Sequence, residues 1–412
     1  MATYDSYKDS GVKWLGQIPS HWEVKKCRAF FDEVIEQNLS RKSSNQLQFQ
    51  YGTIVPKANQ VLDREVWKTI SKYTLVKPGD IVINGLNLNY DLISQRIGIV
   101  KESGVITSAY ISIRPKELSS AKFYEYLLKA LDARKTFHGF GTGVRATLSW
   151  KELKHKLLPL VPFKEQVGIV GYLDKVTGEI DRAIETQRKM IDALNERKQI
   201  IITRAFQNEN SEWDYIPFRH VFEMRGGYTP SKADPSLWEN GTIPWYRMED
   251  IRKSGRFLNE AIQYVNRKAV KAKGTFKAGS FIMAICTASI GEHAMLIADS
   301  LANQRFANLK IRKSLEHRLL PMFIFYYLYV VGDFCRNNAN STCFQYVDME
   351  GLKKLPVPMP SVKEQESIVT QLEKETSTLT NAIANCERMI CLLTERKQII
   401  INEVVTGKKK VV

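Results

Sequence analysis

The stretch Glu196-Arg197-Lys198-Gln199-Ile200-Ile201-Ile202 occurs a second time, residue for residue, as Glu395-Arg396-Lys397-Gln398-Ile399-Ile400-Ile401. The two copies lie 199 residues apart in a chain of 412, and Lys164-Glu165-Gln166 recurs as Lys363-Glu364-Gln365 at the same offset. Solenoid repeats have periods of roughly 20 to 50 residues, so this period excludes a solenoid. The sequence predicts a duplicated domain, each copy of which ends in the same helix.

Weaker echoes between the repeated stretches predict short strands and helices in both halves. The segment Lys77–Val82 recurs as Lys277–Ile282, and Phe123–Leu128 recurs as Phe323–Leu328. A turn residue pair followed by alternating or continuous apolar residues favours a strand, and a longer apolar-periodic run favours a helix. We expect strands at Ile81–Ile83, Ala109–Arg114, Phe276–Ala284 and Ala307–Arg312, and helices at Ala121–Leu131 and Met322–Val331.

The repeated C-terminal segments carry a heptad pattern, in which apolar residues recur at alternating steps of three and four. Ser361 followed by Glu364 forms a capping box for the second helix. About 40 residues at about 1.5 Å each give a rod on the order of 60 Å long. One such helix alone could be a wall of an ordinary core; two in one chain, packed along their seams, must run antiparallel. The predicted seam residues are Ile169, Leu173, Val176, Ile180, Met190, Leu194, Ile368, Leu372, Leu379, Met389, Leu393 and Ile400.

These patterns together predict an α+β fold. It has two similar mixed α/β domains, separated by two long antiparallel coiled-coil helices, with a pseudo-two-fold internal repeat. The expected boundaries are 1–157 for the first domain with its N-terminal arm, 158–206 for the first helix, 207–357 for the second domain, and 358–412 for the second helix and a basic tail.

The composition favours an acidic partner. Lys and Arg number 60 against 44 Asp and Glu, a formal charge of +16, which suits nucleic acid or an anionic surface, although a merely basic surface would look the same. The longest apolar run, Leu319–Val331, contains Pro321 and is too short to span a bilayer. The first residues show no basic segment followed by an apolar one, so we expect a cytoplasmic protein.

Neither a metal site nor a disulfide framework is expected. The six cysteines include no C-x-x-C pair, and the six histidines form neither H-x-x-x-H nor H-E-x-x-H. We interpret the cysteines as reduced thiols and assign no catalytic residue, metal ligand or cofactor to this chain.

The loops that differ between the two halves mix amides, guanidinium groups, hydroxyls and aromatic rings with glycine. Asn and Gln can read adenine, Arg can read guanine, and glycine lets backbone N–H groups approach phosphate. Two readers of different short sequences would need such divergent loops, whereas any single residue could simply satisfy its own turn. The candidate DNA-binding residues of the first half are Asn84, Asn87, Asn89, Tyr90, Arg96, His138, Thr142, Arg145 and Thr147. Those of the second half are Arg225, Tyr228, Lys232, Trp245, Arg247, Arg252, Asn303, Gln304 and Arg305.

Two segments carry a resemblance to a known family. The opening Tyr7–Trp22 resembles that of the DNA specificity subunits of type I restriction-modification systems, and Pro159–Gln166 followed by a long helix, present twice, resembles their conserved regions. The resemblance covers nearly the whole chain. One departure is that the second half keeps only Trp213 of the opening motif.

The resemblance implies two target recognition domains, each reading half of a bipartite site in double-stranded DNA. It also implies a helix pair that sets the spacer and docks two modification (methyltransferase) subunits. S-adenosylmethionine, ATP and Mg²⁺ would then belong to partner subunits, with restriction subunits supplying translocation and cleavage in the full complex.

Two other function classes stay open. A methyltransferase or nuclease acting alone is disfavoured, because the chain has no Pro-Pro dipeptide, no Gly-Lys-Ser/Thr phosphate loop and no Pro-Asp pair. A coiled-coil regulator that binds double-stranded DNA without an enzyme partner would share the charge and the helices. Copurification with a methyltransferase would separate this regulator from a specificity subunit.

Overall fold

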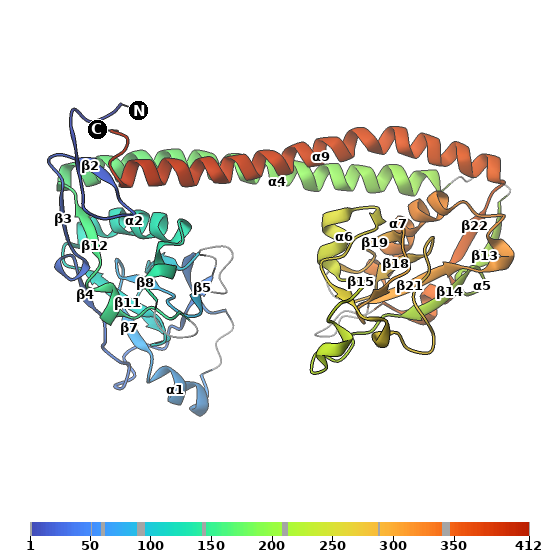
Figure 1. The fold of residues 1–412 in the computed structure, drawn as a ribbon, viewed down its shortest axis with the longest axis horizontal. Helices are drawn as coiled ribbons and strands as arrows, with labels where there is room; N and C mark the ends of the chain where they lie inside the picture. The colour runs from blue at the N-terminus through green and yellow to red at the C-terminus, as the bar shows by residue number, and fades with distance from the viewer. Residues whose placement is uncertain are drawn as a thin grey trace. The chain divides into compact units, whose positions relative to one another are not determined.

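The computed structural model of the chain describes residues 2–50, 52–58, 62–88, 95–141, 146–207, 213–286, 289–339 and 347–411. Its contacts divide the chain into two compact units (Figure 1). Unit 1 is 1–188 with 388–412, and unit 2 is 189–387. The division cuts both long helices, α4 (Phe163–Ala205) and α9 (Val362–Val405), so each unit contains a segment of each. The predicted α+β class and the two long helices are confirmed.

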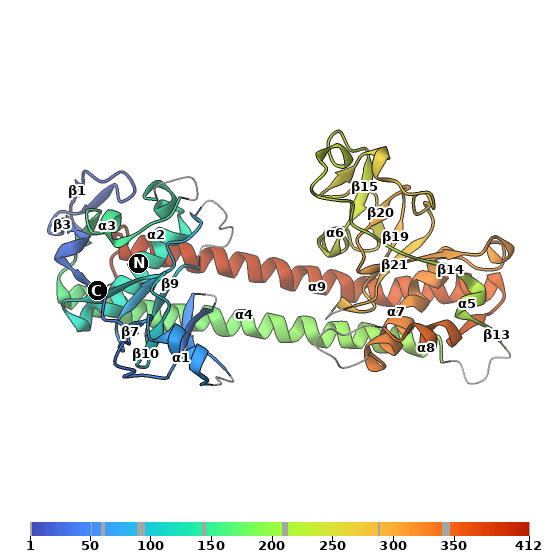
Figure 2. The ribbon, with the colours of Figure 1, turned by 90° about the horizontal axis from the view of Figure 1, so that it is seen from below.

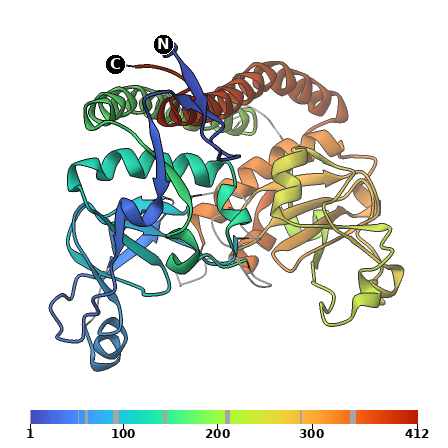
Figure 3. The same cartoon turned by 60° about the vertical axis from the view of Figure 1, so that its left-hand side comes forward.

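Unit 1 is built on a four-stranded antiparallel sheet in the order β4-β11-β8-β9. Helix α2 lies between this sheet and the long-helix segments (Figure 3). Its strands are β1 (Tyr7–Asp9), β2 (Gln17–Pro19), β3 (Glu23–Lys26), β4 (Phe31–Glu33), β5 (Leu47–Gln50), β6 (Thr53–Pro56), β7 (Thr74–Val76), β8 (Ile81–Ile83), β9 (Ile97–Ile99), β10 (Gly104–Ile106), β11 (Ile111–Pro115) and β12 (Leu157–Leu160). Its short helices are α1 (Arg64–Ile70), α2 (Ala121–Ala133) and α3 (Trp150–Leu153).

Unit 2 repeats this plan with a five-stranded sheet in the order β14-β21-β18-β19-β16. Helix α7 takes the place of α2 (Figure 2). Its strands are β13 (Asp214–Pro217), β14 (Phe222–Gly226), β15 (Ile243–Tyr246), β16 (Phe257–Leu258), β17 (Tyr264–Val265), β18 (Phe281–Ala284), β19 (His293–Leu296), β20 (Leu301–Ala302), β21 (Phe306–Ile311) and β22 (Pro356–Met359). Its short helices are α5 (Phe218–Val221), α6 (Met248–Ser254), α7 (Pro321–Asn337) and α8 (Met349–Lys354).

The central strand of each sheet is buried on both faces, because side chains alternate across a strand. In β8, Ile81 and Ile83 join the main core of unit 1, whereas Val82 joins a smaller cluster with Leu47 and Ile54. In β18 the main core takes Phe281 and Met283, and Ile282 and Ala284 join a second cluster. Each sheet therefore separates two apolar layers, and only the layer shared with α2 or α7 reaches the long helices.

The repeated sequence motifs correspond to repeated contacts. At the start of α4 the Gln166 amide donates to Val161 O at 2.8 Å, and at the start of α9 the Gln365 amide donates to Pro360 O at 2.9 Å. The Ser361 and Glu364 side chains make the predicted capping box. A helix start leaves backbone groups without partners, so these side chains fix where each long helix begins.

A second repeated contact joins the sheet helix to a long helix. The Tyr126 hydroxyl lies 3.3 Å from the Thr177 hydroxyl in unit 1, and Tyr326 lies 3.3 Å from Thr376 in unit 2. The two tyrosines are 200 residues apart and the two threonines 199. The duplication therefore extends to how each domain is attached to its helix.

The predicted seam is buried for part of its length. Ile169, Leu173, Ile180, Leu372 and Ile400 are buried. The seam positions that are half-buried are Val176, Leu194, Ile368, Leu379 and Leu393. Met190 and Met389 are 50% and 46% exposed. In unit 1, Asp181 of α4 contacts Lys397 of α9, and in unit 2, Lys198 of α4 contacts Thr380 of α9. The residue number therefore rises along α4 while that of its partner falls along α9, so the two helices pair antiparallel.

Candidate nucleic-acid interface

The two candidate loops of unit 1 contact each other through their backbones. Leu148 N donates to Gly85 O at 2.9 Å, and Leu88 N donates to Ala146 O at 3.2 Å. A Cβ at position 85 would lie 2.2 Å from Leu148 O, so this close approach requires glycine. The segments that the sequence assigned to one reader are thus held together at this point.

Arg96 supports the first of these loops from inside. It is only 7% exposed, and its guanidinium donates to three carbonyls: Asn84 O at 2.9 Å, Leu86 O at 2.6 Å and Asn87 O at 3.2 Å. The sequence placed Arg96 among the DNA-contacting residues. In this structure its donors are directed to the chain itself.

The remaining candidates of unit 1 differ in exposure. Asn87 is exposed and has a left-handed backbone with φ of 51°, which an asparagine tolerates better than most residues. Asn84, His138 and Thr147 are half-buried. The predicted residues Asn89, Tyr90, Thr142 and Arg145 lie outside the described residues.

The three candidate segments of unit 2 also meet. Tyr228 N donates to Ala302 O at 2.8 Å, Thr229 donates from its hydroxyl to Gln304 Oε1 at 2.6 Å, and Asn303 N donates to Tyr246 O at 3.1 Å. Thr229 was not predicted; the only signal for it was its place in a Gly-rich polar loop. These bonds join 225–232, 245–252 and 303–305 into one loop cluster, which we call the unit 2 loops.

Several of the predicted unit 2 residues support these loops. Trp245 is 3% exposed, and its indole N–H donates to Tyr228 O at 3.0 Å. The Arg225 guanidinium donates to Gly274 O at 2.8 Å and packs over the Phe276 ring. The Tyr228 hydroxyl donates to a backbone carbonyl. These side chains hold the loops in shape, as Arg96 does in unit 1.

The exposed side chains of the unit 2 loops are Thr229, Ser231, Lys232, Glu249, Arg252, Gln304 and Arg305. Asn303 and Arg247 are half-buried, and Arg247 lies 3.7 Å from the Glu249 carboxylate. Three of these seven side chains are cationic, and one, Glu249, is anionic. A cationic, glycine-containing loop surface with amides can contact both phosphate and base edges.

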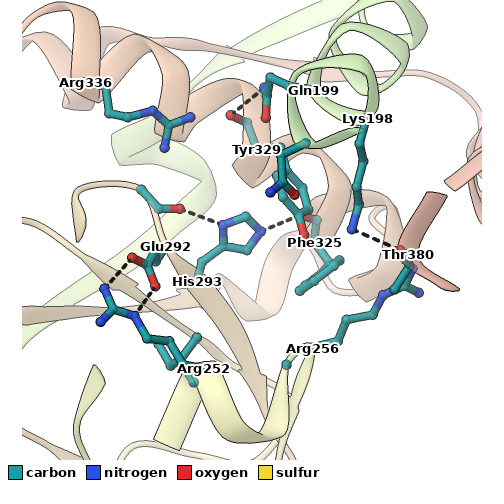
Figure 4. Close-up of a pocket in the computed structure, with 14 residues that line it drawn as sticks. Lys198, Gln199, Arg252, Arg256, Glu292, His293, Phe325, Tyr329, Arg336 and Thr380 are labelled. Carbon is teal, nitrogen blue, oxygen red and sulfur yellow. Dashed lines mark hydrogen bonds and ion pairs between the residues drawn. The ribbon is translucent and has the colours of Figure 1, made fainter. Parts of the chain in front are cut away.

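A cavity of about 590 Å³ lies beside the unit 2 loops, between α6, α7 and the long-helix segments (Figure 4). Arg252, from the unit 2 loops, lines it together with Lys198, Arg256 and Arg336. Of these four, sequence reasoning selected only Arg252 as a site residue. The signal for Lys198 was present in the repeated Glu-Arg-Lys-Gln stretch, which we had treated only as part of a helix.

His293 lies at the edge of this cavity and is buried. Its Nδ1 is 2.9 Å from Gly291 O and its Nε2 is 3.0 Å from Phe325 O. Burial lowers the pKa of His293 to about 4, and the two carbonyls oppose this only in part. We therefore assign a neutral imidazole, which donates to one of the two carbonyls.

Other kinds of site find no support in the part of the chain that is described. Within it, no group of three or more His, Cys, Asp or Glu side chains is placed to hold a metal ion. Cys27, Cys286, Cys335 and Cys386 are buried free thiols, and Cys391 is an exposed one. No helix among the described residues is both long and apolar enough to cross a membrane.

The geometry defines a class of protein, a duplicated α+β domain with basic loops attached to a long helix. Residues 210–386 match the family model described as type I restriction modification DNA specificity domain. The chain is 39% identical over 170 residues to the type I restriction enzyme EcoprrI specificity subunit of Escherichia coli, a match that covers 40% of this chain and 42% of that protein. It is 21% identical over 98% of both chains to the putative type I restriction enzyme MjaX specificity subunit of Methanocaldococcus jannaschii.

The fold has a solved counterpart. A chain from a structural study of complex assembly and conformational transition in the type I restriction-modification system matches with a TM-score of 0.61 at 14% identity, covering 94% of this chain and 98% of that one. The chain is thus similar to specificity subunits of type I restriction enzymes, and the match to the DNA specificity domain lies in its second half.

Proposed function

We propose that this chain is the DNA specificity subunit of a type I restriction-modification complex. Each unit reads one half of a bipartite, asymmetric site through its loops, and the paired long helices set the spacer and dock methyltransferase subunits. The chain itself performs no bond-making chemistry. S-adenosylmethionine-dependent methylation, and ATP- and Mg²⁺-dependent restriction where it occurs, belong to the partner subunits.

The observation that carries this proposal is the duplication. Both units present a corresponding sheet, of four strands in unit 1 and five in unit 2, with a covering helix and the same Tyr-to-Thr attachment to a long helix, yet their exposed loop residues differ. A repeated frame with different loops suits the reading of two different short sequences. The charge of +16 suits a polyanionic target.

Mapping of methylated adenines tests the proposal. Genomes of cells that express the methyltransferase subunits are compared with and without this chain. We expect methylation at one bipartite motif that depends on the chain. Methylation that is unchanged by its removal, or methyl transfer by the purified chain alone, would contradict the proposal.

Duplex binding gives a second test. The logarithm of the binding constant should fall linearly with the logarithm of salt concentration, with about 0.9 in slope for each phosphate contacted. A slope near zero would refute a role for the basic loops.

A further inference from the structure

Each unit contains a cavity built from the same positions of the duplicated helices. The unit 2 cavity is about 590 Å³ and its counterpart in unit 1 about 410 Å³. Four lining positions correspond at the offset of 199: Asn195 with Thr394, Lys198 with Lys397, Gln199 with Gln398, and Thr380 with Asp181. The two cavities can therefore be compared residue by residue.

The comparison isolates one difference of charge. In unit 1, Lys397 Nζ lies 2.7 Å from both carboxylate oxygens of Asp181. In unit 2, Lys198 Nζ donates to the Thr380 hydroxyl at 3.3 Å and lies 5.7 Å from the centre of the Tyr329 ring, and both partners are neutral. Over the described ranges, no carboxylate oxygen lies within ion-pair distance of Lys198. Where unit 1 has an internal anion, unit 2 has a neutral hydroxyl.

The other cations of the unit 2 cavity are already paired. Arg252 lies 3.1 Å from Glu292, Arg256 lies 2.6 Å from Glu373, and Arg336 lies 2.5 Å from Asp333. The four cations, which Figure 4 shows together with Glu292, thus face three carboxylates, and the charge left over is that of Lys198.

The environment of Lys198 makes its positive charge costly. Burial and the neighbouring Arg256 hold the pKa of Lys198 below its ordinary value, and Glu373 opposes this only in part. An anion brought to the ammonium group would relieve both effects. In unit 1 the Asp181 carboxylate occupies the corresponding position beside Lys397.

We propose that the unit 2 cavity binds one phosphate group of the DNA backbone, through the Lys198 ammonium and the Thr380 hydroxyl. Lys198 supplies N–H donors and the charge, and the Thr380 hydroxyl, which donates to Thr376 O at 2.9 Å in the free protein, can turn its O–H toward the ligand. Arg252 belongs both to this cavity and to the unit 2 loops, so the proposed phosphate site adjoins the loops that we propose contact DNA. This inference rests on the proposed DNA-binding function. It predicts an asymmetric complex, because the unit 1 cavity is closed to anions by its own Asp181.

The test reproduces the unit 1 arrangement in unit 2. Thr380→Asp should pair with Lys198, as Asp181 pairs with Lys397, and displace the phosphate. Binding of the full chain, with its methyltransferase subunits where they copurify, is measured on duplexes that hold the mapped site. We expect affinity to fall about tenfold, the loss of one charge-assisted hydrogen bond, and the log-log salt slope to fall by about 0.9. The preferred base sequence should not change.

Three variants serve as matched controls. Thr380→Asn alters the side chain without adding charge, and Ser377→Asp adds the same charge at an exposed position on α9 outside the cavity. Asp181→Thr removes the unit 1 anion. Each should bind within about twofold of the original chain or more tightly. A Ser377→Asp loss as large as that of Thr380→Asp would attribute the effect to net charge and overturn the site.

Neutral methylphosphonate linkages, placed one at a time along the duplex, identify the occupant. One linkage should weaken binding by the original chain but not by the Thr380→Asp variant. If no linkage behaves so, or if inorganic phosphate at millimolar concentration removes the difference between the two proteins, the backbone assignment is wrong. Failure of the proposed function looks different: the original chain would not prefer the mapped site over a scrambled duplex.

Discussion

Replacement of Arg96 by methionine tests whether this arginine stabilises the first unit 1 loop or contacts a DNA base. The substitution keeps the apolar stem of the side chain and removes the guanidinium that donates to Asn84 O, Leu86 O and Asn87 O. Asn87 is exposed, so its carbonyl can turn to water, whereas Asn84 and Leu86 are half-buried. Two charge-assisted bonds at the low end of about 1.5 kcal/mol each give about 3 kcal/mol for local opening. That corresponds to roughly a hundredfold change in the opening equilibrium.

Hydrogen exchange measures this opening directly, because it reports local as well as global unfolding. The amides of Leu88 and Leu148 bond across the two unit 1 loops and should exchange roughly a hundredfold faster in the Arg96→Met protein. Arg225→Met is the matched control, because it removes a guanidinium that donates to the backbone carbonyls of Gly274 and Thr275 in unit 2. It should leave the Leu88 and Leu148 amides unchanged.

Methylation mapping of the same two variants completes the design. Arg96→Met should weaken recognition across the whole first half-site and leave the second unaltered. If Leu88 and Leu148 keep their protection while a single base of the half-site is relaxed, Arg96 contacts that base and the support role is refuted.

Three further outcomes are expected. His293 has a pKa of about 4 in the folded protein, below the ordinary value of about 6.5. Its contribution to the stability of unit 2 should therefore be complete above about pH 6.5 and be lost as the pH falls toward 4. Chemical denaturation should show that His293→Gln flattens this part of the profile of stability against pH. Leu173→Ala should destabilise unit 1 and Leu372→Ala unit 2, each by about 2 to 5 kcal/mol, and hydrogen exchange should assign each loss to its own unit. Four residues inserted near Phe206 should advance the chain by about 6 Å if they stay helical, and methylation mapping should find a spacer longer by one or two base pairs with both half-sites unchanged.

The helices and strands that the two units share were predictable because local, repeated sequence patterns indicate them. Alternating and periodic apolar residues located β8 and α2 closely, whereas β18 begins five residues later than expected and α7 extends six residues further. The heptad pattern, with Ser361 as a cap, predicted a second helix of about the observed length. Such signals depend on neighbours in sequence, and the duplication presented each of them twice.

The roles of individual loop residues were not predictable in the same way. Arg96 and Trp245 have the chemistry of nucleic-acid contacts, yet the structure directs them to carbonyls of their own loops. Whether the Arg96 guanidinium faces solvent or a turn depends on backbone carbonyls nine to twelve residues away. Sequence identified the loops correctly as polar and glycine-dependent but could not separate their supports from their exposed surface.

The duplication helps to interpret the unit 2 cavity around Lys198. A lysine on a long helix has many possible partners, and its type alone says nothing about its charge balance. Here the same helix occurs twice, and unit 1 shows which group completes the lysine's environment when the chain supplies it, namely the carboxylate of Asp181. At the corresponding position unit 2 has Thr380, so an anion beside Lys198 would have to come from a dissolved salt or a ligand. Basic loops lie beside that cavity, so we infer that the anion is a phosphate of the DNA backbone. Comparison of the two units makes this inference testable, because the unit 1 arrangement can be introduced into unit 2.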